Sequence, residues 1–403
     1  MTTPTWRGSL DERGSAALMR TYARHPLEIA GGHGSWVVDS GGHEYLDFVA
    51  GIAVNSLGHG HPAIVAAIRA AAEGPLHVSN LYWSEPMVRL AERLTQATGM
   101  DRVFFCNSGA EAVEAALKLG RKARPGRSRV LCFERSFHGR TLGALSTTAQ
   151  PAYQKAFRPL LPGVEVLPFG DFDAATAAID ADVTLVLVEP IQGEGGMRPA
   201  PSGWLAHLRR LCDDAGALLV FDEVQSGIGR TGTFFAFQAE EVLPDAVTSA
   251  KALAGGLPMG ALLARGAAAD AFVPGDHAST FGGGPFVATV ANAVLDVILA
   301  PGFLDEVGDK GARLGAGLER VAAKSPRARS VRGRGLMWGL VLTEAVAAEL
   351  TGHLRDQGLL TCPASPDVIR FVPPLTVSTE EIDAAVARLE RGLAAHSSGR
   401  RVG

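Results

Sequence analysis

The residues of this chain that could carry chemistry stand where short apolar segments end in polar side chains. Four such interruptions occur in the middle of the chain: Asn107-Ser108-Gly109, Glu189-Pro190, Asp222-Glu223 and Lys251. Ligands of an open parallel sheet bind at the carboxyl ends of its strands. If the apolar segments are neighbouring strands, a carboxylate and an amine could face one another across a single crevice, as acid–base and nucleophilic chemistry requires.

Lys251 lies between a predicted strand and a glycine-rich turn, in the apolar sequence Ser249-Ala250-Lys251-Ala252-Leu253-Ala254-Gly255-Gly256. Loss of water around the amine would lower its pKa and leave more of it neutral, which is the form that attacks a carbonyl to make an imine. A single lysine in a loop is also the ordinary pattern of a solvated surface charge. The nucleophile interpretation therefore depends on the residues around it.

Asp222 ends an apolar segment, where an unpaired carboxylate would be costly to bury. It needs a cationic partner, and the protonated pyridine nitrogen of a ligand is one candidate. An aspartate that holds this proton would make the ring a strong electron sink. A helix N-cap or a salt bridge to arginine is the alternative.

Ser108-Gly109-Ala110-Glu111 has the pattern of a capping box that opens a helix. Glycine at this position would also let a phosphate approach backbone N–H groups at the positive end of the helix dipole. Capping boxes without ligands are common, so the segment alone does not decide between the two functions.

Two arginines and two histidines are further candidates. Arg370 lies in the apolar segment Val368–Phe371, where a guanidinium needs a carboxylate from the protein or from a ligand. Arg140 follows Phe137-His138-Gly139. His59 and His61 have no accompanying Cys, Asp or Glu cluster, so we expect a turn there and no metal site.

The elements that must position these residues are predicted by apolar periodicity. Strand-like segments at Arg102–Cys106, Arg129–Phe133, Val183–Val188 and Ala217–Phe221 alternate with helical segments such as Glu111–Ala123 and Trp204–Ala215. This alternation predicts an α/β fold in which a mainly parallel central sheet is covered on both faces.

The pattern of predicted helices and strands changes toward both ends of the chain. We expect a large domain over residues 61–289 and a smaller α+β domain over 290–403. Strand-like pieces at Trp36–Asp39 and Glu44–Phe48 flank a Gly41-Gly42 turn, and we expect the segment 1–60 to pack against the small domain.

Composition excludes several classes of protein. The 403 residues are 47% hydrophobic and carry 38 basic and 42 acidic residues, which gives no basic stripe for nucleic acid. No apolar run approaches the ~18 residues of a membrane span, and the N-terminus does not read as a secretory signal. The four cysteines lack CxxC spacing, so buried thiols are expected in preference to disulfides or metal ligands, which fits a cytoplasmic protein.

Taken together, the motifs resemble the fold-type-I, class III aminotransferases, and most closely the acetylornithine aminotransferases. They run in order as YLDFVAGIAVNSLGHGHP (45–62), CNSGAEA (106–112), SFHGRT (136–141), EPIQGEGG (189–196), FDEVQSGIGRTG (221–232), AKALAGGLPMGA (250–261), STFGG (279–283) and VIRFVPPL (368–375). The resemblance covers Gly34 to Leu389, and so many ordered motifs are specific together.

The resemblance implies pyridoxal 5'-phosphate as the cofactor, with Lys251 as the Schiff-base lysine and Asp222 as the partner of the pyridine nitrogen. Gln225 would lie near the phenolic oxygen, Phe137 would stack on the ring, and Ser108, Gly109 and Ala110 would hold the phosphate. Thr280 would reach the phosphate of the neighbouring subunit, so that the sites of a homodimer form at its interface.

For the substrates, the resemblance implies that Arg140 and Ser279 bind the acylated amino acid. Arg370 would take the α-carboxylate of the keto-acid, and Glu194 would help the site accept both substrates. The sequence departs from the family at Val113, Ala254 and Gly284, which bears on the exact amine. Ile52 lies near the position of a tyrosine in ornithine aminotransferases, and its identity favours an N-acylated substrate.

We therefore expect transamination between N-acetylornithine, or a close N-acylated ω-amino acid, and 2-oxoglutarate, in arginine biosynthesis or, as the nearest alternative, lysine biosynthesis. Related amino donors remain open: acetyllysine, carrier-bound aminoadipate, succinylornithine, ornithine and 4-aminobutyrate. A pyridoxal-phosphate enzyme of another reaction class, or a binding protein on the same scaffold, are the remaining alternatives.

Overall fold

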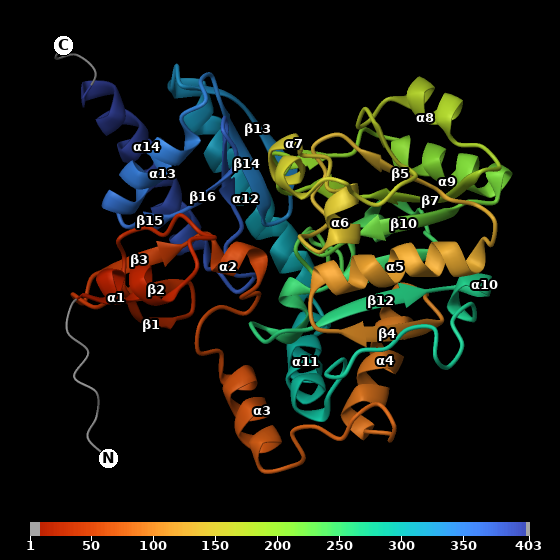
Figure 1. Ribbon diagram of the computed structural model, residues 1–403. Helices are drawn as coiled ribbons and strands as arrows, with labels where there is room; N and C mark the ends of the chain where they lie inside the picture. Colours follow the sequence, from red (N-terminus) through yellow and green to blue (C-terminus); the bar gives the residue numbers. More distant parts are fainter. Residues whose placement is uncertain (1–8, 400–403) are drawn as a thin grey trace.

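The structure is a computed structural model that describes residues 9–399, with the backbone alone given for 395–399. Figure 1 shows a large sheet with its helices beside a second, smaller group of sheets and helices that contains both ends of the described chain.

The large sheet has seven strands. Their spatial order is β4 (Arg102–Cys106), β12 (Gly260–Ala264), β11 (Ala246–Ser249), β10 (Leu218–Asp222), β7 (Val183–Val188), β5 (Arg129–Phe133) and β6 (Val164–Leu167). The pairs from β11 to β6 are parallel, whereas β12 runs antiparallel to both of its neighbours. The prediction of an α/β fold with a mainly parallel sheet is confirmed.

Side chains that alternate along the strands build a core on each face of the sheet. In β7, Leu185 and Leu187 pack in one cluster with α5 (Gly109–Ala123), while Val186 and Val188 pack in another cluster with α9 (Trp204–Ala215). A strand buried on both faces is mostly apolar, which is why β7, with the single exception of Thr184, consists of valine and leucine.

Further helices surround this sheet. They are α3 (Pro62–Ala72), α4 (Glu85–Thr98), α6 (Leu142–Thr147), α7 (Pro151–Gln154), α8 (Phe172–Ala178), α10 (Gly266–Ala269) and α11 (Pro285–Ile298), with 3₁₀ turns η1 (Lys155–Phe157), η2 (Ala236–Glu240) and η3 (Lys251–Ala254). A short hairpin of β8 (Ile191–Gln192) and β9 (Arg198–Pro199) follows β7.

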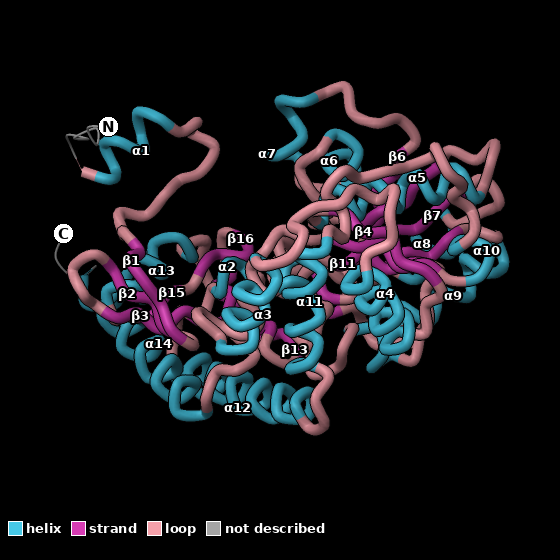
Figure 2. The backbone as a smooth tube through the Cα atoms, turned by 90° about the horizontal axis from the view of Figure 1, so that it is seen from below, coloured by secondary structure: helices cyan, strands magenta, loops and turns pink. Residues whose placement is uncertain are grey.

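The remaining elements form two four-stranded sheets. One is antiparallel, in the order β13 (Ala328–Arg334), β14 (Met337–Leu342), β17 (Val368–Phe371) and β16 (Cys362–Ser365), and it packs with α12 (Phe303–Lys324), α13 (Ala347–Asp356) and α14 (Thr379–Gly399). The other joins β1 (Ile29–His33), β2 (Trp36–Asp39) and β3 (Glu44–Asp47) to β15 (Leu359–Leu360). Helices α1 (Leu10–Ala17) and α2 (Ala50–Ala53) flank the N-terminal strands, and α1 stands off the body of the molecule (Figure 2).

We keep the division at residues 60 and 290 as a proposal, with α11 crossing the second boundary. Within residues 9–399, no single helix is long and apolar enough to cross a membrane; the bent pair α11 and α12 passes that test only when the two are joined, by length and composition. All four cysteines are free thiols, and burial raises the pKa of Cys106, Cys132 and Cys212 to about 12.

Candidate active site

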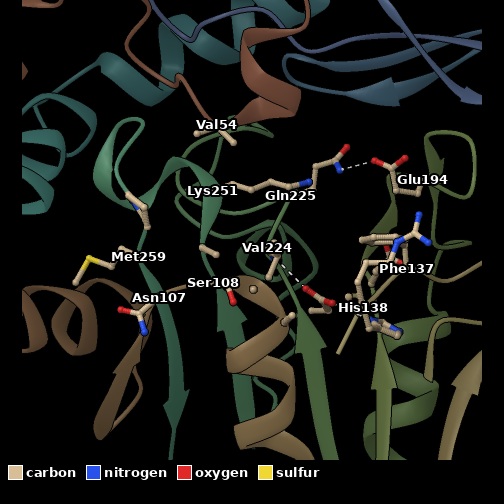
Figure 3. Close-up of a pocket in the computed structure, with 18 of the residues that line it drawn as sticks. Val54, Asn107, Ser108, Phe137, His138, Glu194, Val224, Gln225, Lys251 and Met259 are labelled. Carbon is tan, nitrogen blue, oxygen red and sulfur yellow. Dashed lines mark hydrogen bonds and ion pairs between the residues drawn. The ribbon is translucent and has the colours of Figure 1, made fainter. Parts of the chain in front are cut away.

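A cavity of about 430 Å³ opens at the carboxyl ends of β4, β10 and β11 (Figure 3). This is the edge of the sheet at which open parallel sheets bind ligands, and the volume is that of a small-molecule site. Most of the site residues expected from the sequence line it: Ser108, Gly109, Ala110, Phe137, Arg140, Glu194, Asp222, Gln225 and Lys251. Four interruptions that are far apart in the sequence thus meet in one place.

The first turn of α5 faces the cavity with free backbone donors. Ser108 is the N-cap and its Oγ accepts from the N–H of Glu111 at 3.2 Å. The expected capping box is only half formed, because Glu111 accepts from the N–H of Asn107 at 2.7 Å and not from that of Ser108. The N–H groups of Gly109 and Ala110 therefore remain for an anion, at the positive end of the helix. A Cβ on Gly109 would lie 2.8 Å from Val224, so glycine lets the helix begin this close to the cavity wall.

Lys251 follows β11 and extends into the cavity (Figure 3). Its backbone has a φ of 42°, in the left-handed region that non-glycine residues seldom adopt, and such strain is typical of functional positions. Burial lowers the pKa of the Lys251 amine to about 8, although Glu194 acts in the opposite direction. The amine makes no hydrogen bond within the described part of the chain, so it is available for reaction.

Asp222 is held on three sides. Its Oδ1 accepts from the Thr248 hydroxyl at 3.0 Å and from the N–H of Val224 at 3.0 Å, and its Oδ2 lies 2.6 Å from His138 Nδ1. His138 is fully buried, and its Nε2 has no partner among the described residues. No arginine or lysine pairs with Asp222 in the described chain, and the contact of its Oδ2 with the His138 ring fixes the carboxylate at the cavity wall.

Sequence reasoning placed Glu189 at a strand end without giving it a role and did not single out His138, and both residues line the cavity. Burial, and next the charge of Asp222, raise the pKa of Glu189 well above its ordinary value. The Glu189 carboxyl accepts from the N–H groups of Phe137 and Gly193, at 3.1 Å and 3.2 Å. The signal for His138 was its place beside Phe137 in the SFHGRT motif, together with the need of a buried aspartate for a partner.

Arg370 lies behind the cavity wall and contacts residues that line it. Its guanidinium forms an ion pair with Glu194, and the same group donates to Gln225 at 3.3 Å and to Cys362 Sγ at 3.3 Å. Burial works to lower the pKa of Arg370, but Cys362 and Glu194 outweigh it and raise that pKa. Burial likewise works to raise the pKa of Glu194, and the charges of Arg370 and Lys251 hold it below its ordinary value.

Ser279 and Thr280 lie outside this cavity. Ser279 Oγ accepts from the side-chain amide of Asn107 at 3.1 Å, which places it next to the lining. Thr280 faces a separate small hollow together with His77 and Gly284. One chain therefore brings Ser279 to the edge of the site and does not bring Thr280 to it.

The structure also bears on Ile52 and on His59, which the sequence analysis discussed. Val54, and not Ile52, lines the cavity, and Ile52 is 37% exposed. His59 Nε2 lies 2.9 Å from Asp47 Oδ2. Among residues 9–399 no group of three or more His, Cys, Asp and Glu side chains could hold a metal ion.

The chain is similar to known aminotransferases. Residues 18–393 match the model of the family described as aminotransferase class-III. An acetylornithine aminotransferase of Gloeobacter violaceus is 49% identical over 382 residues, which cover 93% of this chain and 94% of that protein. A solved N-acetylornithine aminotransferase of Stenotrophomonas maltophilia aligns with a TM-score of 0.84 at 39% identity, covering 97% of this chain and 100% of the other. A solved ornithine aminotransferase of Toxoplasma gondii aligns with a TM-score of 0.93 at 32% identity, covering 97% and 95%.

Proposed function

The chain belongs to the class-III aminotransferase family, and we propose that it transfers the terminal amino group of N-acetylornithine, or of a close N-acylated ω-amino acid, to 2-oxoglutarate. The products are the semialdehyde and glutamate. The observation that carries the proposal is the presence of two arginines, Arg140 and Arg370, at a cavity that also contains a buried, unpaired lysine amine. This set is suited to two carboxylate-bearing substrates that react in turn at one amine.

Pyridoxal 5'-phosphate is the cofactor of this family, and the residues of the cavity fit it. When bound, it supplies an aldehyde that accepts the amino group and a ring that withdraws electrons. The free N–H groups at Gly109 and Ala110, with Ser108, suit the phosphate. The buried carboxylate of Asp222 suits a protonated ring nitrogen, because no arginine or lysine pairs with it in the described chain. Gln225 and Phe137 would contact the ring from their places in the lining.

Among the residues of the protein, we assign the nucleophile and proton-transfer roles to Lys251. With a pKa of about 8, roughly a tenth of the amine is neutral at pH 7, and this fraction can act as a nucleophile or remove a proton from the terminal carbon of the amine. Asp222 and His138 keep the opposite wall fixed while the proton moves.

Each of the two arginines would bind the carboxylate of a different substrate. Arg140, with Ser279 at the edge of the site, would bind the carboxylate of the acylated amine. Arg370 would bind the α-carboxylate of 2-oxoglutarate after Glu194 moves away from it. Because Glu194 pairs with Arg370 in the described structure, the protein itself supplies a carboxylate in the place where the keto-acid would bind.

A homodimer is the second part of the proposal. Thr280 lies on a turn next to an exposed apolar patch, which consists of Leu76, Leu81, Tyr82, Trp83 and Phe281. These five side chains are between 61% and 89% exposed, a pattern typical of a surface that another subunit covers. In a dimer joined through this patch, Thr280 would serve the phosphate of the neighbouring site. We also propose a cytoplasmic location and a role in arginine biosynthesis.

Ornithine is the second candidate donor, since the TM-score with the Toxoplasma gondii enzyme is 0.93 against 0.84 with the Stenotrophomonas maltophilia enzyme. The cavity favours the acylated donor, because Val54 offers no oxygen to a free α-amino group. Initial rates with N-acetylornithine, ornithine, acetyllysine, succinylornithine and 4-aminobutyrate test this. We expect the highest kcat/KM with N-acetylornithine, and a preference for ornithine would overturn the assignment.

A further inference from the structure

The guanidinium of Arg140 lies over an aromatic ring. Its central carbon is 3.7 Å from the centroid of Tyr153 and 5.4 Å from that of Phe137. The two rings meet edge to face, with centroids 6.2 Å apart and planes at 90°. A guanidinium at this height over a ring is held by the negative face of the π system.

Stacking is the contact that fixes Arg140. Within residues 9–399, the Arg140 guanidinium has no ion pair with an acidic side chain and no hydrogen bond to an acceptor. Its five N–H donors are therefore unpaired among the described residues, at a position that lines the cavity. A ring holds a guanidinium by its face and leaves the edges, which are the parts that bind a carboxylate in a bidentate manner.

Tyr153 is itself held firmly. It lies in the short helix α7, and its N–H donates to the carbonyl of Gln150 at 2.9 Å. The next residue, Gln154, is buried, and its side-chain amide donates to the carbonyl groups of Leu145, Ser146 and Thr148. The hydroxyl of Tyr153 makes no hydrogen bond in the described structure, so its contacts with Arg140 and Phe137 are made by the ring.

We propose that Tyr153 is a positioning residue that sets specificity for the amine donor. It holds the Arg140 guanidinium over its ring, with the N–H donors unpaired, for the carboxylate of an N-acylated diamino acid. The inference rests on the proposed function, because it needs Arg140 to bind that carboxylate. Donors without a carboxylate at this place gain nothing from the contact.

The test is steady-state kinetics of the holoenzyme with three variants. Tyr153→Leu removes the ring, Tyr153→Phe keeps it, and Phe157→Leu is the control for the same segment, since Phe157 is exposed and outside the cavity. We expect Tyr153→Leu to raise KM for N-acetylornithine about 5- to 30-fold with kcat changed less than about twofold. Tyr153→Phe and Phe157→Leu should stay within about twofold of the parent, and KM for 2-oxoglutarate should not change.

A second series separates stacking from loss of shape. Phenylalanines with one to four ring fluorines, introduced at position 153, keep the shape of the ring and weaken its negative face. KM for N-acetylornithine should rise with each fluorine, while kcat/KM for putrescine, which lacks a carboxylate, should stay constant. A flat series, or a rise for both donors, overturns the inference even if Tyr153→Leu fails to fold.

Arg140→Ala distinguishes this inference from the proposal it rests on. If Arg140→Ala leaves KM for N-acetylornithine unchanged, the assigned role of Arg140 is wrong and the inference fails with it. If Arg140→Ala raises that KM but Tyr153→Leu does not, the role of Arg140 stands and the inference about Tyr153 alone is overturned.

Discussion

The two arginines of the site are held in opposite ways. Arg140 lies exposed on a loop after β5 and is stacked on Tyr153, with its donors free. Arg370 lies in a strand, is 1% exposed, and is occupied by Glu194 and Cys362. An arginine without an internal partner binds a ligand carboxylate directly, whereas a paired one must first exchange a carboxylate for the ligand.

One cavity can therefore bind two substrates in different ways. The donor that uses Arg140 meets a preformed group, and it leaves the Glu194–Arg370 pair intact. The keto-acid that uses Arg370 must displace Glu194, whose charge Lys251 also stabilises. Because buried charges cannot be left unpaired, Glu194 has to find water or another donor when it moves.

Removal of the amine that both substrates share should have the largest effect. Lys251→Ala is expected to lower both half-reactions by at least about 10⁴-fold, because no other described residue of the lining offers an amine. Rapid mixing with each substrate measures this, and the thermal unfolding curve serves as the control for folding. Retention of near-normal rates in either half-reaction would contradict the shared role of Lys251.

Removal of the paired arginine should separate the two half-reactions. Arg370→Ala is expected to lower kcat/KM for 2-oxoglutarate about 10²- to 10³-fold, which corresponds to about 3–4 kcal/mol, because the α-carboxylate loses the guanidinium proposed to bind it. Single-turnover rates with N-acetylornithine should change much less. Arg329→Ala, at an exposed position of β13, is the matched control, and equal losses in both half-reactions would show that the two arginines are not specialised.

Removal of Arg140 should impair the reaction with the amine donor and spare the reaction with 2-oxoglutarate, and its effect should be smaller than that of Arg370→Ala. Arg140→Ala is expected to raise KM for N-acetylornithine about 10- to 100-fold, the range for hydrogen bonds to a charged group at a partly exposed site. The reaction of the amino form of the enzyme with 2-oxoglutarate should keep its rate. A larger effect on 2-oxoglutarate than on N-acetylornithine would reverse the assignment of the two arginines.

The pH dependence of the free amine should give the smallest effect. The neutral fraction of an amine rises with pH up to its pKa, which is about 8 for Lys251. The rate at which the apoprotein captures pyridoxal 5'-phosphate should therefore rise about tenfold between pH 7 and pH 9 and then level off. A rise that continues to pH 10.5 would mean that Lys251 is solvated and that burial does not lower its pKa.

Much of the large sheet could be predicted because buried parallel strands read as apolar runs. Val183–Val188 and Trp204–Ala215 have the same bounds in the sequence prediction and in the structure. The antiparallel strand β12 could not be placed, because the direction of a strand leaves no mark on a short apolar segment such as GALLA.

In the site, residue types were predictable and partners were not. A buried Asp222 required a partner, but only the fold brings His138 to within 2.6 Å of it, across 84 positions of sequence. Likewise, the Glu111 carboxylate accepts from the N–H of Asn107 and not from that of Ser108, because side-chain rotamers decide between neighbouring N–H groups. The choice of Val54 over Ile52 as the lining residue follows from positive φ angles at Gly51 and Ile52, which turn the chain there.

We propose that N-acetylornithine gives its amino group to pyridoxal 5'-phosphate bound at Lys251. The most direct test is the absorbance spectrum of the purified holoprotein before and after addition of N-acetylornithine, with no keto-acid present. We predict that the long-wavelength band of the pyridoxal form is replaced by the shorter-wavelength band of pyridoxamine phosphate, and that 2-oxoglutarate then restores the first band. A cofactor band that N-acetylornithine leaves unchanged would contradict the donor, and the absence of any band after addition of pyridoxal 5'-phosphate would contradict the claim as a whole.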